Sequence, residues 1–158
     1  MFKEMPREQL YALAREMFPC VGFHTRRATR LVTQHYDKAL ASAGVRSTQY
    51  SLLSVLSLQE ETSMQELALV LGMDRTTLTR NLNPLVRKGW VKVAASEDRR
   101  ARPLALTAKG RAALEKARPL WEATQAGIVA QVGAARWEQI MRGLHQISML
   151  IEQMEDDK

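Results

Sequence analysis

The sequence has few of the residues on which most catalytic and metal centres depend. It contains a single cysteine, Cys20, so no internal disulfide can form. Its cysteine and three histidines form no cluster with zinc-ligand spacing, and no glycine-rich phosphate loop follows a predicted strand. No serine, histidine and carboxylate set shows the local pattern of a nucleophile with its base. We therefore expect no metal, no cofactor and no enzymatic activity.

Long hydrophobic runs are also missing. Hydrophobic residues make up 46% of the 158 residues, yet no apolar run reaches the about 18 residues that suggest a membrane span. The first residues, MFKEMPREQ, lack the apolar segment of a signal peptide. The length fits one domain with a sizeable core. We expect a cytoplasmic protein that makes no contact with a membrane.

Acidic residues are outnumbered in the first two thirds of the chain. The formal net charge is +6, with seven bases against four acids in residues 1–43 and nine against six in residues 44–107. Residues 108–158 carry seven of each. The positive field therefore belongs to the front of the chain, where a partner with many phosphates would fit.

Local signals predict a helix-turn-helix between residues 63 and 88. Ser63 and Glu66 form a capping box, so a short helix should begin at residue 64 and end at the glycine of the turn. Asp74 can cap a second helix over about 75–88. The apolar stripe expected to face the core contains Leu78, Leu82, Leu85 and Val86.

The opposite face of this second helix combines small hydroxyls with long cations. It carries Arg75, Thr76, Thr77, Thr79, Arg80 and Asn83. No acid follows the cap along this helix, and such a face suits a groove lined with phosphates and base edges. We interpret it as a DNA-recognition helix. A charged face that is simply solvated is the alternative.

A short hairpin with a basic tip follows. Residues 90–93 and 104–106 read as two strands, and the segment SEDRRAR between them is too polar for a core. Pro103 must sit where its missing N–H is not needed. Residues 73–102 hold eight lysines and arginines against three acids. We predict a mostly α fold with a small β-hairpin wing, a winged helix-turn-helix. A winged helix that binds protein instead of DNA is a further alternative.

Helices at both ends carry apolar stripes that the motif does not use. Helical spacing predicts them over residues 7–18, 21–42, 108–132 and 137–154. Unclaimed apolar stripes at both termini favour a homodimer in which the first and last helices of two chains interlock. A monomeric bundle is the alternative.

The same reasoning divides the chain into three parts. Residues 1–43 should form N-terminal helices that serve dimerisation. Residues 44–107 should form the DNA-binding region, in which Ser47 is expected to cap a supporting helix over 48–58. Residues 108–158 should form C-terminal dimerisation helices.

The order of these signals resembles the MarR (multiple antibiotic resistance regulator) family. The resemblance rests on LGMDRTTLTRNLNPLVRKGWV at 71–91 and EDRRARPLALTAKGRAAL at 97–114. The family's wing pattern is matched by Asp98, Arg100, Leu106, Thr107 and Gly110. The resemblance implies a homodimeric transcriptional regulator, mostly a repressor, that binds a pseudopalindromic operator. It also implies that residues 59–62 add a third, minimal strand.

Particular DNA contacts follow if the second helix and the wing bind DNA as the resemblance implies. In the predicted complex, Thr76, Thr77 and Arg80 reach bases or nearby phosphates in the major groove. Arg100 is the candidate for the minor groove, where narrow A·T-rich segments have an enhanced negative potential. Asp98 would orient an arginine. Flanking backbone contacts are assigned to Arg99 and Arg102, and Arg75 and Thr79 complete the recognition face.

The family commonly responds to small aromatic acids bound between the dimer helices and the DNA-binding lobe. The resemblance therefore implies that residues 1–43 also form part of a ligand pocket. The candidate ligand residues here are Phe23, His24, Arg27, His35, Tyr36 and Trp121. The basic side chains could pair with a carboxylate, and the aromatic ones could form apolar walls. The alternative is a redox-sensing regulator that responds through Cys20, because one branch of the family senses peroxides through an N-terminal cysteine. That branch's sensing position, however, aligns near Phe23.

Overall fold

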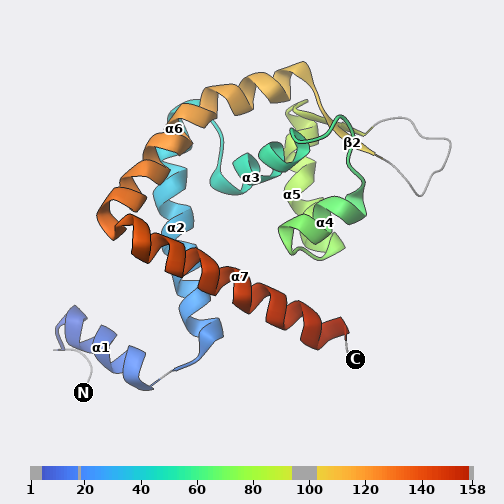
Figure 1. The fold of residues 1–158 in the computed structure, drawn as a ribbon. Helices are drawn as coiled ribbons and strands as arrows, with labels where there is room; N and C mark the ends of the chain where they lie inside the picture. The colour runs from blue at the N-terminus through green and yellow to red at the C-terminus, as the bar shows by residue number, and fades with distance from the viewer. Residues whose placement is uncertain (1–4, 18, 94–102, 157–158) are drawn as a thin grey trace.

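The computed structural model describes residues 5–17, 19–93 and 103–156, and within them the chain is mostly helical with one small antiparallel sheet (Figure 1). The helices before the sheet are α1 (Arg7–Met17), α2 (Val21–Leu40), the 3-10 turn η1 (Ala41–Ala43), α3 (Ser47–Leu56), α4 (Met64–Leu71) and α5 (Arg75–Arg87). The sheet contains β1 (Val91–Val93) and β2 (Leu104–Leu106), and α6 (Ala108–Val132) and α7 (Ala134–Asp156) follow it. The predicted fold class is confirmed.

The hydrophobic core lies where α3, α4 and α5 pack against the end of α2, the sheet and the start of α6. Its largest fully buried side chains are Leu40, Leu52, Leu53, Leu56, Leu67, Leu78, Leu85 and Val91. Burying a leucine stabilises a fold by about 1.5–3 kcal/mol relative to leaving it exposed. This leucine-rich core therefore sets the position of the helix-turn-helix.

The helix-turn-helix is fixed by the local interactions that the sequence predicts. The Ser63 hydroxyl accepts from Glu66 N at 3.1 Å, and Glu66 Oε2 accepts from Ser63 N at 2.8 Å. These hydrogen bonds hold the pKa of Glu66 below its ordinary value. Gly72 ends α4 with φ of 58°, in the left-handed region that favours glycine. Asp74 then caps α5, as predicted.

The sheet is short and closes over the end of α5. Val91 pairs with Leu106, and Val93 pairs with Leu104. Thr62 adds an isolated bridge, with N–H···O contacts of 2.9 and 2.8 Å to Leu104, so the expected third strand is a single residue pair. Pro103 precedes β2 and lies outside the ladder, which fits its lack of an N–H.

Two sequence-based expectations are wrong. Ser47 does not cap α3, because the cap is Arg46 and the Ser47 N–H donates to Asp37 Oδ1 at 2.7 Å. The helix accordingly spans Ser47–Leu56, one residue earlier at its start than predicted and two at its end. Val86 is not part of the buried stripe of α5 and is 40% exposed.

Helices α2, α6 and α7 form an open arrangement around the part of the chain that contains α3, α4 and α5 (Figure 1). Helix α6 packs along α2 and α3, and α7 turns back from it at Gly133, whose φ is 84°. Helix α7 exposes apolar side chains along its length, namely Ile140, Met141, Leu144, Ile147, Met149, Leu150, Ile151 and Met154. Within the described ranges, no helix is both long and apolar enough to cross a membrane.

Candidate nucleic-acid interface

The exposed face of α5 presents the side chains predicted to read DNA. Arg75, Thr76, Thr79, Arg80 and Asn83 line one shallow hollow on this face. All five are at least partly exposed, whereas Leu78, Leu82 and Leu85 on the other side are buried. Helical geometry thus places cations and hydrogen-bonding groups together on a convex surface of the width that a major groove accepts. Asn83 was not among the predicted contacts.

Thr77 has a different position from the other predicted contacts. Its N–H donates to Asp74 Oδ1 at 2.8 Å, and its hydroxyl donates to Asp74 Oδ2 at 2.6 Å. These two bonds hold the pKa of Asp74 below its ordinary value, with the hydroxyl contributing most. Thr77 is therefore part of the cap that starts the recognition helix. Its hydroxyl keeps only acceptor capacity toward DNA.

The hydroxyls in the hollow also differ from one another. Thr79 Oγ1 donates to the Arg75 carbonyl at 2.7 Å, as threonines in helices often do. Within the described residues, Thr76 makes no side-chain hydrogen bond, and its hydroxyl faces solvent. Thr76, Asn83 and the two arginines therefore offer the donors with the greatest freedom.

The predicted contacts at the wing tip, Asp98, Arg99, Arg100 and Arg102, lie outside the described residues. The base of the wing is described, and it is tied firmly to α6. Thr107 N donates to the Trp90 carbonyl at 3.0 Å, and the Thr107 hydroxyl donates to the Gly89 carbonyl at 2.6 Å. The same hydroxyl accepts from Gly110 N at 3.0 Å. This joint connects the end of the recognition helix, the sheet and α6.

The six residues predicted to bind a ligand fall into three places. Tyr36 and Trp121 lie together, with ring centroids 6.4 Å apart, and Tyr50 stacks on Trp121 at 5.4 Å. The Tyr36 hydroxyl donates to Gln125 Oε1, and burial raises the Tyr36 pKa. This aromatic stack joins α2, α3 and α6.

A cavity of about 270 Å³ opens beside the stack. It is lined by Val32, Thr33, Tyr36, Ser47, Thr48, Ser51 and Trp121. Ser47 Oγ is buried, with no hydrogen-bond partner in the described residues. The hydroxyls of α3 were missed at the sequence level, although Ser47, Thr48 and Ser51 recur at the helical spacing that puts them on one face.

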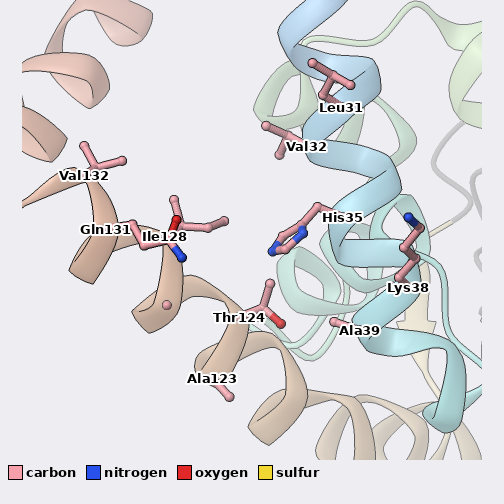
Figure 2. A pocket seen from close by; sticks show the side chains of 11 residues that line it. Leu31, Val32, His35, Lys38, Ala39, Ala123, Thr124, Ile128, Gln131 and Val132 are labelled. Carbon is pink, nitrogen blue, oxygen red and sulfur yellow. The ribbon is translucent and has the colours of Figure 1, made fainter.

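His35 lies in a second, larger space. A groove of about 860 Å³ runs between α2 and α6, and Figure 2 shows His35 pointing from α2 toward α6 within it. Its walls are mostly apolar, including Leu31, Val32, Ile128 and Val132. The structure therefore does not bring His35 into the cavity beside Trp121.

The remaining three predicted residues lie near the start of α2. Phe23 and His24 pack edge to face, with ring centroids 5.3 Å apart. The Arg27 guanidinium lies 3.9 Å from the ring centroid of Tyr11 and links α2 to α1. Residues 5–17, 19–93 and 103–156 contain no group of three or more histidine, cysteine or acidic side chains suited to a metal ion.

A helix-turn-helix with an exposed cationic second helix, followed by an antiparallel hairpin, defines a winged-helix DNA-binding protein. A family model described as MarR family matches residues 43–101. The crystal structure of the M. tuberculosis transcriptional regulator MOSR in complex with DNA is 46% identical, with a TM-score of 0.78, over 85% of this chain and 97% of that one. The chain belongs to the MarR family. The relatives that it matches are DNA-binding regulators of transcription and not enzymes.

Two further relatives agree with this assignment. The transcriptional repressor MprA of Escherichia coli K12 is 29% identical over 127 residues, which is 78% of this chain and 72% of MprA. The transcriptional repressor CouR bound to a 23-mer DNA duplex is 26% identical, with a TM-score of 0.75, over 85% of this chain and 96% of CouR.

Proposed function

We propose that this protein is a repressor that binds a pseudopalindromic operator as a homodimer and is released by a small aromatic or phenolic acid. The observation that carries the DNA-binding part is the α5 face on which Arg75, Thr76, Thr79, Arg80 and Asn83 line one hollow. Relatives described as repressors, and two related structures with bound DNA, support occlusion of a promoter as the mode of action.

The exposed face of α5 would enter the major groove. Arg80 and Thr76 would reach bases or adjacent phosphates, and Arg75 would contact the backbone near the helix start. Thr77 would support them by capping the helix through Asp74. At the wing, Arg100 would enter the minor groove with Asp98 as its orienting partner, in keeping with the sequence-based prediction.

Arg99 and Arg102 of the wing would contact flanking phosphates. In the dimer, the two α5 helices and their wings would lie about one DNA turn apart and would match successive major grooves of a pseudopalindrome. The symmetry of the operator would then mirror the two-fold symmetry of the dimer.

The outer helices would form the dimer. The exposed apolar side of α7 and the mostly apolar groove between α2 and α6 are complementary in character, and each would be covered by the second copy. Residues 1–43 and 108–158 would therefore serve dimerisation, and residues 44–107 would serve DNA binding. His35, which points into the groove, would lie at or near this interface.

The cavity beside Trp121 would hold the effector. Its flat aromatic wall suits a ring, and the hydroxyls of Ser47 and Thr48 suit a carboxylate or phenol. Ser51 Oγ donates to the Ser47 carbonyl at 3.2 Å, so it would act as an acceptor for a phenol. The unpartnered Ser47 Oγ would gain a hydrogen bond when a ligand binds. Because α3 belongs to the DNA-binding lobe and α2 and α6 to the dimer helices, a ligand here would act by favouring one arrangement of the two over the other.

A salt-dependent binding measurement tests the DNA-binding part. The probe is a duplex fragment from upstream of the protein's own coding sequence. We expect affinity to fall linearly with the logarithm of salt concentration, and Arg100→Ala to flatten the slope by about 0.9 for each phosphate that the variant no longer neutralises. An unchanged slope and affinity would remove Arg100 from the interface. Failure of the wild-type protein to bind in dilute salt would contradict the function.

A thermal-shift screen with aromatic carboxylates tests the effector. A ligand of the native dimer raises the melting temperature by mass action, by an amount set by its concentration relative to Kd. Ser47→Ala should reduce the shift, and the same ligand should release the DNA fragment. A ligand whose shift is unchanged in Ser47→Ala binds elsewhere.

Oxidation of Cys20 is the second candidate signal. The thiol is exposed, and Cys20 is the N-cap residue of α2. Stoichiometric peroxide should then release DNA, and mass spectrometry should locate the oxidation. Release that persists in Cys20→Ser would exclude this route.

A further inference from the structure

Lys88 differs from Arg75 and Arg80 because its ammonium group contacts the protein itself. It is the C-cap residue of α5. Its Nζ donates to the Gly44 carbonyl at 3.2 Å and lies 4.1 Å from the centroid of the Trp90 ring. Arg75 and Arg80, by contrast, line the exposed hollow of the recognition helix.

The carbonyl that Lys88 reaches belongs to the turn between α2 and α3. Gly44 closes η1 with φ of 70°, and its own N–H donates to the Ala41 carbonyl at 3.0 Å. Val45, the next residue, is buried, and Ser47 begins α3 at the cavity beside Trp121. The carbonyl of Gly44 is thus held at the point where a dimer helix leads into the DNA-binding lobe.

The ring that Lys88 covers belongs to Trp90, which lies between the end of α5 and the start of β1. Trp90 is buried. Its backbone N–H donates to the Leu85 carbonyl at 2.9 Å, and its backbone carbonyl accepts from Thr107 N. A cation over an aromatic face is attracted by the ring quadrupole, and lysines near helix C-termini also bond to free carbonyls. Lys88 therefore meets the end of the recognition helix, the α2–α3 turn and the base of the wing.

We propose that Lys88 is a positioning residue, which holds the C-terminal end of the recognition helix against the α2–α3 turn, and that it is not a phosphate contact. This inference rests on the proposed function, because it names the residue through which a change at the effector cavity reaches the DNA-binding face. A ligand in the cavity that alters the path of residues 44–47 would move the Gly44 carbonyl, and Lys88 would carry that change to α5.

Salt dependence separates positioning from phosphate binding. Lys88→Met keeps the aliphatic stem and removes the charge, Lys88→Arg keeps a donor and a cation, and Arg80→Met provides the comparison for a DNA contact. We expect Lys88→Met to weaken binding to the upstream duplex fragment about threefold to tenfold. The slope of log affinity against log salt concentration should stay equal to that of the wild type. Arg80→Met should lower the slope by about 0.9 per phosphate contact.

Lys88→Arg should restore most of the affinity. Active protein is counted by stoichiometric titration, so a loss of folded material cannot imitate weaker binding. A slope lowered in Lys88→Met as it is in Arg80→Met would make Lys88 a phosphate contact and overturn the proposal. An affinity equal to that of the wild type would also overturn it.

Nuclear magnetic resonance tests the contact without DNA. The Lys88 side-chain protons should be shifted upfield by the ring current of Trp90, and the shift should vanish in Trp90→Leu. Hydrogen exchange at Gly44 and at the last turn of α5 should accelerate together in Lys88→Met. Side-chain shifts typical of free lysine, or exchange unchanged at Gly44, would contradict the proposal, even if the wild type bound no duplex and the proposed function itself had failed.

Discussion

Gly110→Ala should damage the joint that connects the recognition helix, the wing and α6. A Cβ atom at Gly110 would lie 2.1 Å from the Trp90 carbonyl oxygen, 2.9 Å from its carbon and 3.2 Å from Leu106 Cδ2. Two of these three atoms are backbone, so a side-chain rotation cannot relieve the contact. Either α6 or the chain at Trp90 must move, and the 3.0 Å hydrogen bond from Thr107 N to Trp90 O would be strained.

The expected loss of stability follows from three contributions. Overpacking costs about 1–3 kcal/mol, with the upper end applying where backbone must shift. A weakened hydrogen bond adds about 1 kcal/mol, and the better helix propensity of alanine returns about 1 kcal/mol. The net loss in unfolding free energy is therefore about 3 kcal/mol. DNA affinity should fall too, because the wing base and the end of α5 share this joint.

Denaturant unfolding at fixed protein concentration measures this change. Ala112→Gly is the matched control, since Ala112 is exposed two residues further along α6 and reports the propensity difference alone, about 1 kcal/mol. Without a steric conflict, Gly110→Ala would be stabilising by a similar amount. A Gly110→Ala protein as stable as the wild type would show that the close approach of α6 to Trp90 imposes no such conflict.

Three further substitutions test other parts of the structure. Asp74→Ala should lower the urea midpoint at pH 7, and the difference from wild type should shrink as pH falls below 3.8, because the depressed pKa of Asp74 gives stability only while the carboxylate is charged. Thr62→Val should raise unfolding free energy by about 1 kcal/mol, since the Thr62 hydroxyl is buried without a partner in the described residues; a lower midpoint would count against this. Leu144→Glu should dissociate the proposed dimer in sedimentation, whereas the exposed Leu69→Glu should not.

Much of the helix-turn-helix could be predicted from sequence because its signals act over three or four residues. The Ser63 and Glu66 capping box, the Asp74 cap and the Gly72 stop each depend on neighbours within one helical turn. The chain therefore carries this information locally. The paired strands and the exposed face of α5 followed from the same kind of signal.

The start of α3 could not be predicted in this way. Asp37, ten residues earlier, accepts from the Ser47 N–H and leaves Arg46 in the cap position. Only the packing of α2 against α3 brings that carboxylate there. Ser47 is consequently the first residue of α3, and its hydroxyl is buried next to the cavity instead of capping the helix.

The predicted ligand residues failed to converge for a geometric reason. Phe23 and Tyr36 lie on one helix and are separated by about 20 Å at about 1.5 Å rise per residue, too far for one small acid to contact both. His35 and Tyr36 are adjacent and therefore point to different sides of α2, one into the groove and one into the aromatic stack. Residue type alone does not reveal which side faces a cavity.

The proposed function depends above all on two copies of the chain presenting α5 and the wing to one stretch of duplex. Titration of the upstream fragment with the protein, followed by sedimentation velocity across a series of salt concentrations, measures both the stoichiometry and the charge dependence of that complex. We expect two chains per site and a steep loss of affinity with salt that Arg80→Met makes shallower. A single chain per site, or no complex even in dilute salt, would contradict it.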